Sequence, residues 1–173
     1  MNDTFVSDAC AGLDQGIALL RSLSPAQYAA RSPACFHSSI GGHVRHNYDH
    51  FACFLDGLPR GEVDYDARAR DPRIETDPVH AALRLADAVR ALGELDGPAL
   101  ARNLRVTMDG GSGARAWTRS TPARELQFLI SHSIHHYAMI AVICHGLHVA
   151  LDPAFGVAPS TQRHLKALAP CTR

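Results

Sequence analysis

The feature that most constrains the fold is a helical spacing of apolar residues, which recurs in four long segments of the chain. In each segment the apolar side chains return every three or four residues, which places them on one face of an α-helix. The four segments cover residues 4–23, 40–58, 78–95 and 121–145. Such helices must bury their apolar faces against one another, so the pattern predicts an all-α four-helix bundle.

Capping residues predict where these helices begin and end. The pairs Asp77–Pro78 and Thr121–Pro122 each combine a side chain that caps a helix with a proline suited to its first turn. Gly57 marks the end of the second long segment. A further cap at Ser24 predicts a short turn of helix, and another short helix is expected after Pro159.

Two connections differ from the helices in composition. Between residues 104 and 120, glycines separate two short arms, which predicts a small β-hairpin before the fourth helix. Within this hairpin, Met108 and Trp117 are expected to cover the bundle, with a substrate contact as the alternative. The segment 61–75 is rich in charged residues and is expected to be a solvated connection, whose acidic residues rim the cleft if it folds over the second helix.

Length and composition limit the classes of protein. The chain has 173 residues, which predicts a single domain spanning 1–173 with a sizeable core. Its 17 basic and 17 acidic residues balance, so nucleic acids and anionic membranes are not expected partners. The N-terminus lacks the basic-then-apolar order of a secretory signal and no apolar run spans a bilayer comfortably, so a cytoplasmic location is expected. The five cysteines are scattered without a CxxC pair, which predicts buried thiols rather than disulfides.

Eleven histidines are the unusual part of the composition, and several fall at helical spacing. At about 100° per residue, His43, His46 and His50 lie within roughly 60° of one another on the second helix. His132 and His136 lie one turn apart on the fourth helix. If the two faces meet, the imidazoles form a metal site in the bundle core. The alternative is that each cluster lies, partly hydrated, at an end of the bundle.

Other metal and catalytic motifs are absent from the sequence. No glutamate is followed three residues later by a histidine, which excludes the Glu-x-x-His pairs of di-iron bundles. The HExxH, GxSxG, GxxxxGK[ST] and GxGxxG motifs are also missing. The remaining candidate is an all-histidine site with open coordination positions.

Two segments resemble the DinB/YfiT-like family of metal-binding four-helix bundles. The stretch SIGGHVRHNYDHF (39–51) is similar to the family pattern of a Ser/Thr-Ile/Val-Gly start, a ligand histidine and an acidic residue; His46 and Asp49 match the last two. The stretch SHSIHHYAMI looks like the fourth-helix motif of two metal histidines four residues apart, matched by His132 and His136. Where many relatives have Arg-Gly-Gln after the last ligand, this chain has Tyr-Ala-Met.

The resemblance implies three metal ligands, and the extra histidines and helical spacing add a set of supporting residues that could shift or expand the ligand set. The implied ligands are His46, His132 and His136. The supporting set consists of His50 and Asp49, as orienting or proton-transfer residues, and of His43 and Cys53, near the metal.

The resemblance also implies a range of functions. Zinc or nickel is the expected ion, with iron or cobalt as alternatives. The implied chemistries are metal-dependent hydrolysis of a small molecule, and transfer or isomerisation with a low-molecular-weight thiol; a homodimer is expected from the resemblance. One alternative is a non-catalytic metal-binding or stress-related interaction module. Another is a scaffold that dimerises through helix faces and has incidental histidines.

Overall fold

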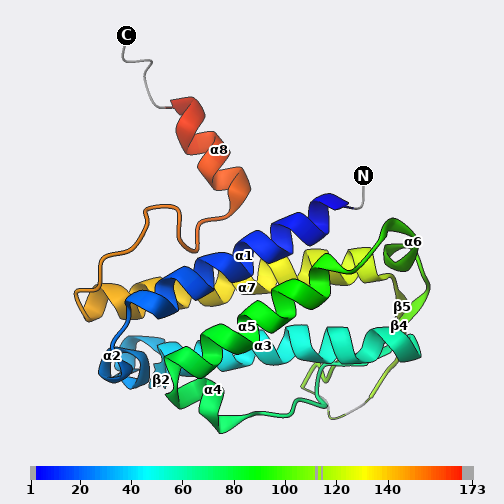
Figure 1. The fold of residues 1–173 in the computed structure, drawn as a ribbon, viewed down its shortest axis with the longest axis horizontal. Helices are drawn as coiled ribbons and strands as arrows, with labels where there is room; N and C mark the ends of the chain where they lie inside the picture. The colour runs from blue at the N-terminus through cyan, green and yellow to red at the C-terminus, as the bar shows by residue number, and fades with distance from the viewer. Residues whose placement is uncertain (1–2, 112, 114, 169–173) are drawn as a thin grey trace.

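The computed structural model describes residues 3–111, 113 and 115–168, and its core is a bundle of four long helices (Figure 1). The helices are α1 (Asp3–Ser22), α3 (Ile40–Gly57), α5 (Pro78–Gly93) and α7 (Pro122–Gly146). Both α1 and α3 pack against α5 and α7. Helices α1 and α7 run in one direction, and α3 and α5 run in the other (Figure 1). The predicted all-α bundle is confirmed.

Side-chain caps start the long helices that follow α1. The Ser39 hydroxyl accepts a backbone N–H of the first turn of α3 at 3.0 Å. The Asp77 carboxylate accepts two such groups at the start of α5, and the Thr121 hydroxyl accepts one at the start of α7. The short helices α2 (Pro25–Ala29) and α8 (Pro159–Leu168) lie where the sequence predicted them. Local capping chemistry therefore sets these boundaries.

The bundle core consists of apolar side chains from all four long helices. The fully buried members include Leu13, Phe51, Phe54, Leu85, Leu92, Leu126, Leu129 and Ile140. Burying one such side chain contributes about 1.5–3 kcal/mol. Helix α7 is long and apolar enough to cross a membrane by length and composition. It packs against α1 and α3 and carries buried residues along its length, as a core helix of a bundle does.

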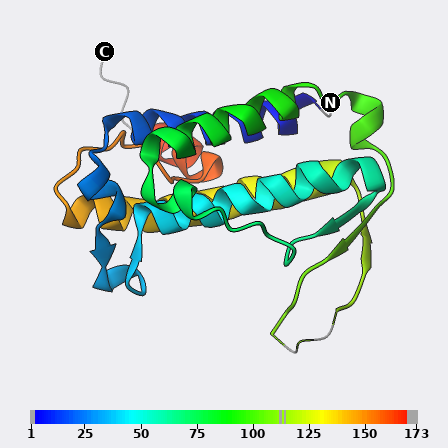
Figure 2. The same cartoon turned by 60° about the horizontal axis from the view of Figure 1, so that its bottom comes forward.

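The connection from α3 to α5 is a crossover that runs alongside α3 (Figures 1 and 2). It contains η2 (Leu58–Arg60), β3 (Glu62–Asp64) and α4 (Pro72–Thr76). The expectation of a solvated connection over residues 61–75 is wrong at Val63, Tyr65 and Ile74, which are buried, while the other residues of the segment are exposed or partly exposed. These three apolar side chains are scattered among charged residues, so the composition of the segment concealed them.

Gly41 allows the end of the crossover to approach α3 closely. A Cβ atom on Gly41 would lie 2.0 Å from the backbone oxygen of Glu75 and 2.9 Å from a ring carbon of Tyr28. The Tyr28 hydroxyl donates a hydrogen bond of 2.6 Å to the backbone oxygen of Ile74. These contacts hold the crossover against the start of α3.

The predicted hairpin is present as strands β4 (Leu104–Thr107) and β5 (Thr118–Ser120), which pair antiparallel. Strand β3, which the sequence pattern did not predict, pairs parallel with β4 and places Val63 opposite Val106. Figure 2 shows the hairpin projecting from the bundle after α6 (Gly97–Leu100). A second small sheet joins β1 (Arg31–Ser32) to β2 (Ser38–Ser39) around η1 (Pro33–Cys35).

The hairpin does not bury its two largest apolar side chains. Met108 is 50% exposed and Trp117 is 39% exposed. The Trp117 ring instead lies 5.1 Å from the guanidinium carbon of Arg105. The expectation that these residues cover the bundle is wrong, because both side chains lie on the exposed part of the hairpin.

The cysteines within the described residues are free thiols. Cys35 and Cys144 are buried, and Cys10 and Cys53 are partly buried. This agrees with the expectation of unpaired, mostly buried thiols. Cys171 lies outside the described residues.

Candidate metal centre

Three imidazoles from two adjacent helices meet inside the bundle. His46 projects from α3, and His132 and His136 project from α7, one turn apart. Their candidate ligand nitrogens all lie within 4.8 Å of one another. The ring centroid of His46 lies 5.1 Å from that of His132 and 4.6 Å from that of His136. The structure therefore brings together the three residues that the family resemblance implied as ligands.

Two further histidines extend this cluster. The His50 ring centroid lies 4.3 Å from that of His132. Its Nδ1 is 2.9 Å from the backbone oxygen of His46, and because an oxygen can only accept, Nδ1 carries the proton and Nε2 keeps a lone pair. Nδ1 of His43 lies 3.1 Å from Nδ1 of His136, so one of these rings donates to the other. His43 and His50 are buried beside the cluster, where they were expected.

Burial keeps the clustered imidazoles neutral. Desolvation, followed by the charges of neighbouring histidines, lowers the pKa of His46, His132 and His136 to about 3. Desolvation also lowers the pKa of His43 and of His50. A metal ion binds the neutral form of imidazole, so these side chains are in the binding form at neutral pH.

The donor set fits a divalent transition metal. Nε2 of His132 is buried and has no hydrogen-bond partner in the protein. Leaving a buried polar atom unpaired costs about 1–3 kcal/mol, and a cation among the three nitrogens would give this atom a partner. Imidazole ligands suit zinc, nickel, iron and cobalt.

Arg68 reaches the cluster from the crossover, and sequence reasoning missed it. Its Nη1 lies 3.0 Å from Nδ1 of His46, a residue 22 positions earlier in the chain. The side chain is partly buried, and its Nε has no hydrogen-bond partner. Arg68 is one of several arginines in a charged segment, so no local signal distinguishes it.

Asp49 and Cys53 follow His46 on α3 but have other neighbours. Asp49 is 3% exposed, and its Oδ2 lies 3.7 Å from Nη1 of Arg45. Burial raises the pKa of the Asp49 carboxyl, and it raises the pKa of the Cys53 thiol to about 11. Within the described residues, the group of mutually close ligand atoms contains neither of them. Their supporting roles stay predictions.

A cavity of about 250 Å³ has Tyr65 and Phe128 in its wall, and these two rings separate it from the histidine cluster. Tyr65 stacks on His50 with ring centroids 5.5 Å apart, and Phe128 lies 5.5 Å from His132. The rest of the lining comes from the hairpin and the start of α7: Val106, Met108, Ala116, Thr118, Arg124 and Glu125. The cavity therefore lies between the hairpin and the two aromatic rings, Tyr65 and Phe128, that pack against the histidine cluster.

Buried Glu125 fixes this wall. The Tyr65 hydroxyl donates to Oε2 of Glu125 at 2.8 Å, and the Ser120 hydroxyl donates to Oε1 at 2.5 Å. Hydrogen bonds to a charged group are among the stronger ones in proteins, so they lock the tyrosine ring against His50.

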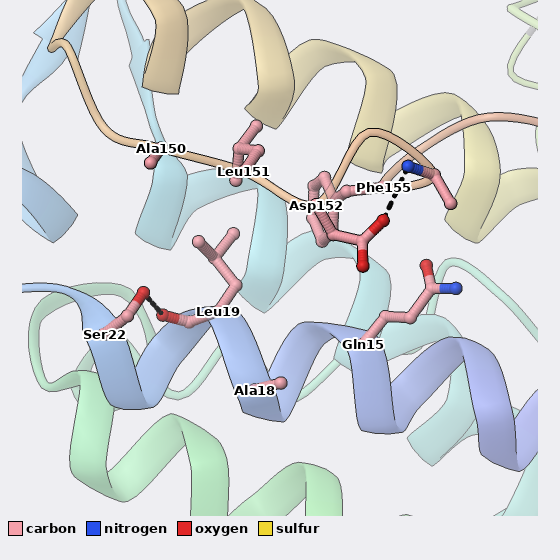
Figure 3. Close-up of a pocket in the computed structure, with 9 residues that line it drawn as sticks. Gln15, Ala18, Leu19, Ser22, Ala150, Leu151, Asp152 and Phe155 are labelled. Carbon is pink, nitrogen blue, oxygen red and sulfur yellow. Dashed lines mark hydrogen bonds between the residues drawn. The ribbon is translucent and has the colours of Figure 1, made fainter.

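A second cavity, of about 290 Å³, lies between α1 and the segment that follows α7 (Figure 3). Its lining consists of Gln15, Ala18, Leu19, Ser22, Ala150, Leu151, Asp152, Ala154 and Phe155. The Asp152 carboxylate accepts the backbone N–H of Ala154 at 2.7 Å. This lining offers no imidazole or thiol, so the histidine cluster is the stronger candidate for chemistry.

The fold and its centre define a class of protein: a helical bundle with a histidine cluster that spans two adjacent helices. Residues 14–140 match the family model of the DinB superfamily. The chain belongs to this family, whose members generally bind metal.

Two known proteins are similar to this chain. A stretch of 109 residues is 34% identical to FK506-binding protein 5 of Rhizopus delemar, which covers 60% of this chain and 28% of that protein. The chain therefore matches less than a third of the length of this relative. The crystal structure of the DinB-like protein YjoA from Bacillus subtilis is similar with a TM-score of 0.62 and 21% identity, over 86% of this chain and 95% of that chain. This likeness shows the fold.

Proposed function

We propose that this chain binds a divalent transition metal through His46, His132 and His136 and is a metal-dependent enzyme. The convergence of three neutral imidazoles from two adjacent helices is the observation that supports this most strongly. When bound, such an ion supplies Lewis acidity, which lowers the pKa of a water molecule or a thiol. Zinc or nickel is the favoured ion, with iron or cobalt as alternatives.

The chain's own residues would orient and shield the reaction. The hydrogen bond from His50 to a backbone carbonyl fixes that ring, and His50 and Asp49 are the candidates for proton transfer. Tyr65 and Phe128 separate the cluster from solvent on the cavity side. The adjoining cavity suits a small molecule, which supports a hydrolase or a transferase or isomerase that uses a low-molecular-weight thiol.

Metal analysis of protein purified without a histidine tag tests the ligand set. Wild-type protein should retain one ion per chain, and substitution of His46, His132 or His136 by alanine should abolish retention. His135→Ala is the matched control, because His135 lies on α7 beside the cluster but is exposed. Retention of metal by all three ligand variants would rule out this set.

Activity assays then separate an enzyme from a binding module. Metal-loaded protein should turn over esters, or thiol-reactive electrophiles in the presence of a low-molecular-weight thiol, and the chelated protein should not. A non-catalytic module would show a higher melting temperature with metal but no turnover. That alternative has one observation in its favour: the aligned segment is only 28% of the longer fungal relative. A cytoplasmic location and a homodimer stay predictions.

A further inference from the structure

Arg68 brings a positive charge to the histidine cluster. It lies in the crossover between β3 and α4, which the buried side chains of Tyr65 and Ile74 anchor on either side of it. Its Nη1 lies 3.0 Å from Nδ1 of His46. The guanidinium therefore lies against one of the three clustered imidazoles.

Within the described residues, Arg68 differs from several other arginines because it forms no ion pair. In the part of the chain that the structure describes, it has no carboxylate within 4.0 Å, whereas Arg45 pairs with Glu75 and Arg115 pairs with Asp64. Its Nε is buried without a hydrogen-bond partner. The contact with His46 is therefore the hydrogen bond that holds the head group of Arg68.

This hydrogen bond determines where His46 carries its proton. Guanidinium nitrogens only donate, so Nδ1 of His46 accepts with its lone pair. A neutral imidazole has one N–H, and it must then be on Nε2. The contact with Arg68 thus selects one tautomer of His46.

Coordination of a metal by His46 is incompatible with this contact. A metal on Nδ1 would need the same lone pair that accepts the hydrogen bond from Arg68. A metal on Nε2 would need a lone pair on that nitrogen, so the proton would have to lie on Nδ1. The N–H of Nδ1 would then face the N–H groups of Arg68, and two donors cannot form a hydrogen bond. Whichever nitrogen binds, the guanidinium must leave His46.

We propose that Arg68 weakens metal binding at this centre, because it is an internal cation that a metal ion must displace from His46. This inference rests on the proposed metal site. Every ion has to break the same hydrogen bond, so all are weakened by a similar factor. Zinc and nickel bind imidazole strongly enough to stay bound despite this loss of affinity. Manganese lies at the weak end of the divalent series, so the same loss leaves its affinity too low for the protein to retain it.

Metal titration of an Arg68→Met variant tests the proposal, because methionine keeps an unbranched side chain but removes the charge and all donors. Zinc and manganese should each bind the variant about 10- to 100-fold more tightly than wild-type protein, in competition with a chelator. This gain corresponds to about 1.4–2.8 kcal/mol, the range of a charge-assisted hydrogen bond. Arg70→Met removes the same charge from an exposed neighbour and should leave both affinities unchanged.

Nitrogen-15 NMR of the histidine rings gives a second measurement that needs no variant. In chelated wild-type protein, His46 should carry its proton on Nε2 and accept a hydrogen bond at Nδ1, and addition of zinc should shift the resonance of the nitrogen that binds the ion. A proton on Nδ1 of metal-free His46, or unchanged or weaker metal binding by Arg68→Met, overturns the proposal. If neither protein binds metal, the proposed site itself fails and the inference with it. If wild-type protein binds one ion and Arg68→Met binds it equally well, the inference alone fails.

Discussion

Replacing Gly41 by alanine should loosen the crossover that carries Arg68. The new Cβ would lie 2.0 Å from the backbone oxygen of Glu75, which must retreat beyond 3.0 Å to reach a distance found in real structures. Overpacking of this kind costs about 1–3 kcal/mol. The movement also strains the hydrogen bond from Tyr28 to Ile74, whose loss costs about 1 kcal/mol. The better helix propensity of alanine offsets at most about 1 kcal/mol of this.

We therefore expect Gly41→Ala to lower the free energy of unfolding by about 1–3 kcal/mol. Urea denaturation of chelated protein, followed by circular dichroism and extrapolated linearly to water, measures this change. Gly12→Ala is the matched control, because nothing lies within 4 Å of its added Cβ and α1 should gain from the substitution. Equal stability of the two variants would refute the reasoning.

Three further predictions concern the cluster and its surroundings. Lowering the pH from 7 to 5 should destabilise the chelated protein. The histidines of the unfolded chain, with a pKa near 6.5, bind protons in this range, whereas the folded imidazoles, with a pKa of about 3, stay neutral. Each imidazole changes the free energy of unfolding by at most about 1.4 kcal/mol per pH unit. Urea titrations should therefore show a smaller pH dependence of stability for His132→Gln than for wild-type protein, and an equal dependence would contradict this account. Tyr65→Phe leaves buried Glu125 without one donor and should cost about 1–3 kcal/mol by calorimetry, whereas Trp117→Ala on the exposed hairpin should stay within about 0.5 kcal/mol. Zinc at a hundred times its Kd should stabilise the wild-type protein by about 2.7 kcal/mol in thermal melts but leave His136→Ala unaffected, and equal stabilisation of both would place the ion elsewhere.

The long helices could be predicted from the sequence because their signals are local. Each has an apolar face at helical spacing, and caps such as Asp77 and Thr121 mark its start within a few residues. The i,i+4 pair His132 and His136 likewise lies on one turn of one helix. The expectation that His46 would join that pair came from the family pattern, and the packing of α3 against α7 brings the three together.

The crossover could not be predicted, because its structure depends on contacts far along the chain. Strand β3 forms by pairing with β4, which begins about 40 residues later, and three residues are too few to show an alternating pattern. Tyr65 is buried because its ring stacks on His50 and its hydroxyl meets Glu125, and neither contact is visible in the charged segment around it. The same holds for Arg68, whose role is set by where the crossover crosses α3.

The position of Trp117 has a practical consequence, since it is the one tryptophan in the sequence. Its neighbours Ala116 and Thr118 line the cavity that Tyr65 and Phe128 bound, while its own ring lies at the surface. Indole fluorescence will therefore report on the hairpin, and far-ultraviolet circular dichroism will report on the helices. A change in Trp117 emission at a lower urea concentration than the helical transition would show that the hairpin opens while the bundle stays folded. The same emission would then report on the binding of small molecules in the cavity that the hairpin lines.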